Sequence, residues 1–167
     1  ERASQSPYII LSADLIAQKA EKPFDITEIN TLSRDRENAI TFKANKPIRM
    51  RVKDGKWGMF FNGTQNLSSD ISLPNNFRYN SPYTISAWVL STKVGPISTV
   101  TSLSSSRADL ANTEFRLGTD PSTGLINHNG SFESSGAPRD IQEGEGKWQF
   151  WTITFDGWME KVYLNGK

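Results

Sequence analysis

The chain has 167 residues, of which 36% are hydrophobic and 11% aromatic, and its formal net charge is +1. This length and apolar content suit one globular domain with its own core and exclude a disordered chain. The near-neutral charge gives no reason to expect a nucleic acid or an anionic membrane as a partner. No stretch approaches the roughly 18 apolar residues that a membrane-spanning helix needs.

The chain contains no cysteine and a single histidine, His128. Disulfide frameworks, thiolate catalysis and cysteine-based zinc sites are therefore excluded. A Ser-His-Asp triad or a multi-histidine metal centre would have to be built around this one imidazole.

Residues 1–39 are the least periodic and are predicted to form an N-terminal lead-in. Two interpretations stay open for residues 11–22, a short helix that ends before Pro23 or an extended arm. From residue 40 to residue 167 the pattern is that of β strands. We therefore place the domain itself at 40–167.

The first clear strand covers residues 48–53, where apolar and basic side chains alternate. Asp54 and Gly55 then predict a tight turn into a returning strand over residues 57–61. Residues 130–147 predict a long polar loop, a feature that is often functional. Further strands are predicted over residues 83–90, 97–103, 115–117, 125–127, 148–155 and 158–164, with a hairpin loop over 120–124 and a turn at 156–157.

Short strands at roughly ten-residue spacing, with turns between them, indicate an antiparallel sandwich or barrel. Along residues 83–90, Ile85, Ala87 and Val89 share one face of the strand, and Trp88 lies on the other. Along residues 148–155, Trp151, Ile153 and Phe155 share one face of the strand.

Several segments, in this order, resemble laminin-G-like modules of the concanavalin A-like lectin and glucanase superfamily. Residues 83–89 read Tyr-Thr-Ile-Ser-Ala-Trp-Val, which is similar to a strand of that family almost letter for letter. The resemblance covers about residues 40–167 and implies an all-β antiparallel sandwich of jelly-roll type. The other matching segments are residues 57–64, 115–118, 146–157 and 161–167.

The family continues past the Asn-Gly-Lys turn, whereas this sequence stops there, at Lys167. The resemblance therefore implies a sandwich that is incomplete at its C-terminal end and belongs to a larger polypeptide or assembly. It also implies an exported protein, secreted or on the cell surface, of the kind that often acts on glycans.

Glycosidases of this superfamily carry paired acids in a Glu-x-Asp-x-x-Glu spacing, which places two carboxylates on one strand face. The sequence contains no such motif. Its nearest acidic cluster, Asp140, Glu143 and Glu145, lies in a segment without strand pattern. We therefore predict that the chain is not an enzyme, and leave open an activity elsewhere in a parent protein.

The five tryptophans suggest sugar stacking, because aromatic faces pack against the apolar faces of pyranose rings. The strand patterns assign Trp57, Trp88, Trp148 and Trp151 to the core. Trp158 follows a predicted turn, near the tip of a hairpin, and is the candidate for ligand contact.

Two groups of polar residues are further ligand candidates. His128, Asn129 and Arg139 lie in or beside the long loop, where they are suited to sugar hydroxyls and acid groups, and the alternative is a mobile polar loop. Arg49, Arg51 and Lys53 form a basic row on one strand face, suited to a sulfated or uronic polysaccharide. For this row the alternative is a charged outer strand that prevents edge pairing.

No cofactor is predicted, although many laminin-G-like modules bind Ca²⁺. Asp70, Asp120 and Asp156 supply suitable oxygen ligands, but their spacing matches no recognised calcium loop. Calcium therefore stays unassigned.

The leading hypothesis is a non-catalytic carbohydrate-binding module of a larger exported or cell-surface protein. Its expected partner is a glycan or polysaccharide, with other domains or chains of a surface assembly as further candidates, and neither nucleic acid nor membrane insertion is expected. The second hypothesis is a structural or adhesive protein-protein interaction domain, and the third is the scaffold of a glycoside hydrolase. An exposed row of coplanar aromatic side chains on a concave sheet would favour the first hypothesis.

Overall fold

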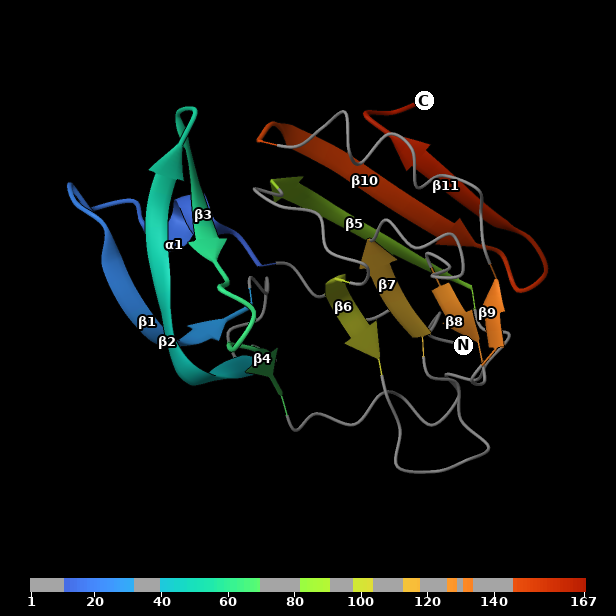
Figure 1. The fold of residues 1–167 in the computed structure, drawn as a ribbon, viewed down its shortest axis with the longest axis horizontal. Helices are drawn as coiled ribbons and strands as arrows, with labels where there is room; N and C mark the ends of the chain where they lie inside the picture. Colours follow the sequence, from blue (N-terminus) through green and yellow to red (C-terminus); the bar gives the residue numbers. More distant parts are fainter. Residues whose placement is uncertain are drawn as a thin grey trace, which may run out of the picture. The chain divides into compact units, whose positions relative to one another are not determined.

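A computed structural model describes residues 11–31, 40–69, 82–90, 98–103, 113–117, 126–128, 131–133 and 146–167. The chain divides into two compact units, Glu1–Ser72 and Leu73–Lys167, and each is described by itself (Figure 1). Antiparallel strands make up nearly all of the described regular structure, which confirms the predicted all-β class. Within the described residues, no helix has the length and apolarity to cross a membrane. The predicted boundary near residue 40 stays a prediction.

Unit 1 is built around one long strand, β2, which has β1 on one side and β3 on the other (Figure 1). A single helical turn precedes the sheet, and the Ser12 hydroxyl accepts a hydrogen bond from the Leu15 N–H at its start. This is the helix interpretation of the N-terminal segment, in a shorter form than predicted. The elements are α1 (Ala13–Ile16), β1 (Phe24–Asn30), β2 (Thr41–Lys53), β3 (Lys56–Phe60) and β4 (Leu67–Ser68), and β4 pairs with the first half of β2.

The core of unit 1 follows from the alternation in β2. Ile48 and Met50 are fully buried, and Ile26 of β1 packs with them in the same buried cluster. The turn from β2 to β3 is the predicted one, because Asp54 and Gly55 both have positive φ, 52° and 75°. Two such residues give the type I′ turn, whose twist matches that of the flanking strands.

Strand β1 lies in the segment predicted as an aperiodic lead-in. Its register against β2 shifts between Ile26 and Glu28, where one residue of β1 faces four of β2. This irregularity lets Ile26 and Ile29, three residues apart, both face the core and both be buried. The period of two is therefore lost, which is why the sequence did not indicate a strand.

Unit 2 contains a three-stranded sheet in the order β11-β10-β5. Trp151 and Ile153 of β10 are buried, and Ile85, Ala87 and Val162 of the neighbouring strands pack against them. The predicted grouping of Ile85 with Ala87, and of Trp151 with Ile153, on one face of each strand is thus confirmed. The elements are β5 (Tyr83–Leu90), β6 (Ser98–Leu103), β7 (Thr113–Leu117), β8 (Ile126–His128), β9 (Ser131–Glu133), β10 (Trp148–Phe155) and β11 (Glu160–Leu164).

The middle of unit 2 differs from the sequence prediction in one respect. Strand β9 lies inside the segment predicted as a long loop, and it pairs with β8. The predicted hairpin loop over residues 120–124 lies outside the described residues; β7 pairs with β6 and also lies beside β8. Only Asn129 and Gly130 separate β8 from β9, and Asn-Gly is the dipeptide that most favours a two-residue hairpin.

Candidate functional site

The sheet β11-β10-β5 has a second face, opposite Trp151 and Ile153. Paired residues of antiparallel strands lie on the same face, so the register fixes its members. We call it the hydroxyl-aromatic face, because most of its side chains carry a hydroxyl or an aromatic ring. It consists of Thr84, Ser86, Trp88, Leu90, Trp148, Phe150, Thr152, Thr154, Lys161 and Tyr163.

An aromatic pair lies toward one end of this face. Trp88 and Phe150 are opposite each other in register, with ring centroids 5.1 Å apart and planes inclined by 37°. The Trp88 side chain is 54% exposed. Its assignment to the core was wrong, because Trp88 alternates with Ala87 and Val89 and only one of the two strand faces meets the core.

The other tryptophans divide between faces. Trp151 is buried, as predicted, and Trp57 is half-buried beside Phe24, with ring centroids 5.8 Å apart. Trp148 is half-buried but lies on the hydroxyl-aromatic face, not on the face of Trp151.

Hydroxyl groups follow the aromatic pair along the strands. The Ser86 and Thr152 hydroxyl oxygens are 3.1 Å apart, within hydrogen-bonding distance across β5 and β10. Tyr163 of β11 lies opposite Thr152, and Lys161 lies opposite Thr154. Exposed aromatic ring surface beside groups that both donate and accept hydrogen bonds suits a ligand with apolar faces and many hydroxyls.

The hairpin between β10 and β11 presents Trp158 at its tip, where the side chain is 91% exposed. Oδ1 of Asp156 accepts hydrogen bonds from the N–H groups of Met159 and Trp158, at 2.7 and 2.8 Å. These two bonds lower the pKa of the Asp156 carboxyl below its usual value. Asp156 thus fixes the turn that displays Trp158, and the role of Trp158 in ligand contact stays a prediction.

The basic row lies on the exposed face of unit 1, as predicted. Arg49, Arg51 and Lys53 are exposed, and they alternate with buried Ile48 and Met50. At Arg49, β2 is paired with both β1 and β3, whereas at Arg51 and Lys53 the described partner is β3 alone. The alternative of a charged outer strand therefore stays open for the end of the row, and the role of the row in ligand binding stays a prediction.

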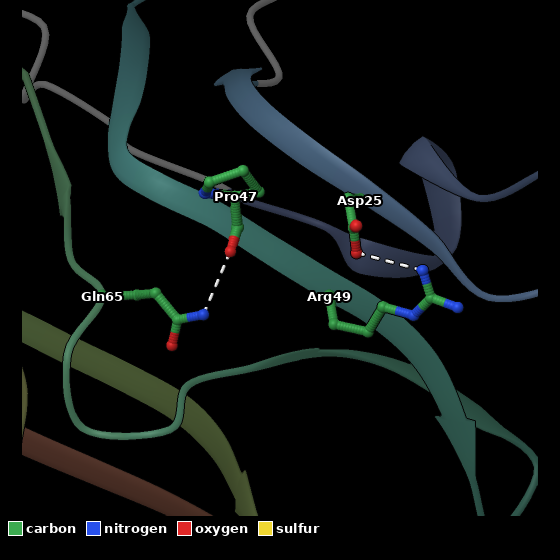
Figure 2. Close-up of polar contacts among 4 residues, drawn as sticks. All are labelled: Asp25, Pro47, Arg49 and Gln65. Carbon is green, nitrogen blue, oxygen red and sulfur yellow. Dashed lines mark hydrogen bonds and ion pairs between the residues drawn. The ribbon is translucent and has the colours of Figure 1, made fainter.

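The three basic side chains have different neighbours. Nη1 of Arg49 lies 3.1 Å from Oδ1 of Asp25 (Figure 2), and Nζ of Lys53 lies 3.6 Å from Oδ1 of Asp54. The Arg51 guanidinium carbon lies 3.6 Å from the centroid of the Phe60 ring, in a cation-π contact.

Figure 2 also shows how the loop after β3 is attached to the same strand. The Gln65 side chain donates a hydrogen bond of 3.0 Å to the carbonyl of Pro47. Asn45 adds two more bonds, from its Nδ2 to the Thr64 carbonyl and from the Asn66 N–H to its Oδ1. These three hydrogen bonds therefore attach the loop over residues 64–66 to β2.

The remaining predicted site residues are only partly described. His128 is the last residue of β8, opposite Ser131, and not part of a loop. Asn129 and Arg139 lie outside the described residues, as do Asp70 and Asp120. Within the part of the chain that the structure describes, no three His, Asp or Glu side chains are grouped as metal ligands. Calcium binding stays a prediction.

Comparison with known proteins identifies the chain through one family. A laminin G family model, described as the concanavalin A-like lectin/glucanases superfamily, matches residues 61–167. No curated protein and no solved structure shows a significant match. The matched range contains the whole sheet β11-β10-β5 with its hydroxyl-aromatic face, and the basic row lies before it. With its antiparallel all-β structure and a match over most of its length, the chain belongs to the concanavalin A-like lectin/glucanase superfamily.

Proposed function

We propose that the chain is a non-catalytic carbohydrate-binding module whose sugar contacts lie on the hydroxyl-aromatic face. The observation that carries the proposal is the position of Trp88, more than half exposed beside Phe150 on the face opposite the core. Stacking a pyranose ring on such a surface buries its C–H face, and a few convergent polar groups then fix its orientation. Ser86 and Thr152 supply hydroxyls of this kind on the same two strands.

The composition of this face supports binding without hydrolysis. Hydrolysis of a glycosidic bond normally needs two carboxyl groups on either side of the bond. Within the described strands β5, β10 and β11, none of the residues on this face is Asp or Glu. The proposal also places the module in an exported or cell-surface protein, as the family resemblance suggests.

A glycan-array screen of the full chain tests the proposal, followed by titration of the best neutral oligosaccharide. Trp88→Ala is expected to weaken binding at least about tenfold, which corresponds to about 1.4 kcal/mol of lost stacking. Trp158→Ala is the matched control, because it removes an exposed indole at the hairpin tip and leaves the face intact. The same titrations with and without calcium test the unassigned cation.

Three results would contradict the proposal. A loss caused by Trp158→Ala alone would move the sugar contact from the face to the hairpin tip. Release of new reducing ends from a bound oligosaccharide would show catalysis. The absence of binding to any glycan would reject the carbohydrate ligand.

A protein-docking role is the second candidate, and one observation favours it. Trp158 and the neighbouring Met159 are 91% and 54% exposed on a turn held by Asp156. Exposed aromatic anchors on rigid turns are common at the centres of protein interfaces. If no glycan binds, proximity labelling from the hairpin tip on the cell surface is the experiment to make next.

A further inference from the structure

Positive charge is concentrated at the end of the β2–β3 hairpin. Lys53 and Lys56 lie directly opposite each other in register, and Arg51 is on the same face of β2, two residues before Lys53. We call these three exposed residues the hairpin cation cluster. Asp54 lies beside the cluster, with its Oδ1 at 3.6 Å from Nζ of Lys53. Three cationic side chains are therefore gathered on one face at the end of the hairpin.

Arg51 differs from Arg49 of the same row. Arg49 is paired with a carboxylate, that of Asp25, whereas neither of the ion pairs between described residues involves Arg51. Its guanidinium instead lies over the Phe60 ring, which orients the plane and leaves the N–H edges for a bidentate acceptor. Gly58, opposite Arg51 in register, adds no side chain to the face at this point.

We propose that the hairpin cation cluster binds the carboxylate or sulfate groups of an acidic polysaccharide. Residues on one strand face repeat about every 7 Å, so the cluster offers successive cations to a linear polyanion. The chain as a whole has a net charge of only +1, so the attraction is local and not a general affinity for polyanions. The sugar nature of the ligand rests on the proposed function, whereas the anionic group follows from the cluster itself.

The test measures binding of the full chain to dextran sulfate and to polygalacturonate. Unsulfated dextran is the neutral counterpart of the first polymer, and oligo(dT) is the polyanion without sugar acid groups. Arg51→Gln and Arg51→Lys are each expected to weaken binding about tenfold, because both remove the guanidinium that stacks on the Phe60 ring and can bind an acid group through two N–H groups. Lys19→Gln, which removes an exposed charge of the same unit outside the hairpin, is expected to have no effect.

The outcomes distinguish recognition by the oriented Arg51 guanidinium from attraction that depends only on the number of positive charges. Binding that Arg51→Lys leaves intact would show that only the number of charges counts and would overturn the proposal. Equal affinity for oligo(dT), or no binding to either acidic polymer at low salt, would also overturn it. Binding to one acidic polymer only would assign the sulfate or the carboxylate as the recognised group.

The two proposals fail independently of each other. Trp88→Ala is expected to leave the response to the acidic polymers unchanged beyond any contribution seen with neutral dextran. The Arg51 variants are expected to leave neutral oligosaccharide binding unchanged. Circular dichroism of each variant confirms that a loss of binding does not come from unfolding.

Discussion

The two faces of the sheet β11-β10-β5 predict different costs for the same substitution. Trp151 is 1% exposed, whereas Trp88 is 54% exposed. The two belong to opposite faces, because the register partner of Trp151 is Ala87, the residue that precedes Trp88 in β5. Truncating a buried tryptophan to alanine costs about 3–5 kcal/mol, so Trp151→Ala is expected to cost about 4 kcal/mol. Trp88 buries about half as much of its surface, so Trp88→Ala is expected to lower the free energy of unfolding by about 1–2 kcal/mol. This figure includes the loss of the ring contact with Phe150.

Urea denaturation followed by far-ultraviolet circular dichroism measures both free energies of unfolding. This signal is chosen because each variant removes a fluorophore. Typical domains are stable by about 5–15 kcal/mol, so Trp88→Ala should stay folded, while Trp151→Ala should be close to its limit. Trp151→Phe is the milder variant if Trp151→Ala does not fold.

Equal losses for Trp88→Ala and Trp151→Ala, within about 0.5 kcal/mol, would refute this reasoning. They would show that the two indoles do not lie on opposite faces. The register that defines the hydroxyl-aromatic face would then be wrong, and the proposed sugar contacts with it.

Three further predictions concern turns and ion pairs. Gly55→Ala should lower the free energy of unfolding, measured by urea denaturation, by about 1–2 kcal/mol. The φ of Gly55 is +75° and no atom lies within 4 Å of an added Cβ, so the whole loss comes from backbone strain. A double-mutant cycle of Asp25→Ala and Arg49→Ala should give a coupling below about 1 kcal/mol that falls with salt, since both side chains are about half exposed. Asp156 accepts two N–H hydrogen bonds, which lower the pKa of its carboxyl below the ordinary value of 3.8. The turn should therefore keep these bonds while the carboxyl is ionised and lose them as the pH falls through the lowered pKa. NMR spectra should show this as a titration of the Trp158 amide signal.

Each of these has a contrary result and a control. A cost near zero for Gly55→Ala would show that the turn does not need positive φ, and Gly55→Asn, a residue that tolerates such φ, should cost less than alanine. Coupling that is insensitive to salt would place the ion pair out of water. An Asp156 midpoint at or above 3.8 would contradict the turn geometry, and Asp156→Asn, which keeps an acceptor without a charge, should remove the titration.

Much of the fold followed from local pattern. The alternation before Asp54 and the positive φ available at Gly55 predicted the β2–β3 hairpin, because both depend only on neighbouring residues. The grouping of Trp151 with Ile153 on one face of β10 followed from the period of two in the same way. The basic row needed no more than strand parity.

Other features depend on partners distant in sequence. Strand β1 escaped prediction because the irregularity in its register is set only by its pairing with β2. Ile26 and Ile29 both face the core only in that register.

The sequence by itself determined that this chain forms antiparallel strands, where most of them turn, and which family it belongs to. Only the tertiary structure decided which of two strand faces meets the core and what the other face brings together. Alternation separates two sets of side chains but does not say which set is buried, because burial depends on what packs against the sheet. The pairing of Trp88 with Phe150, from strands about sixty residues apart, is therefore a property of the register between strands and not of either strand's own sequence.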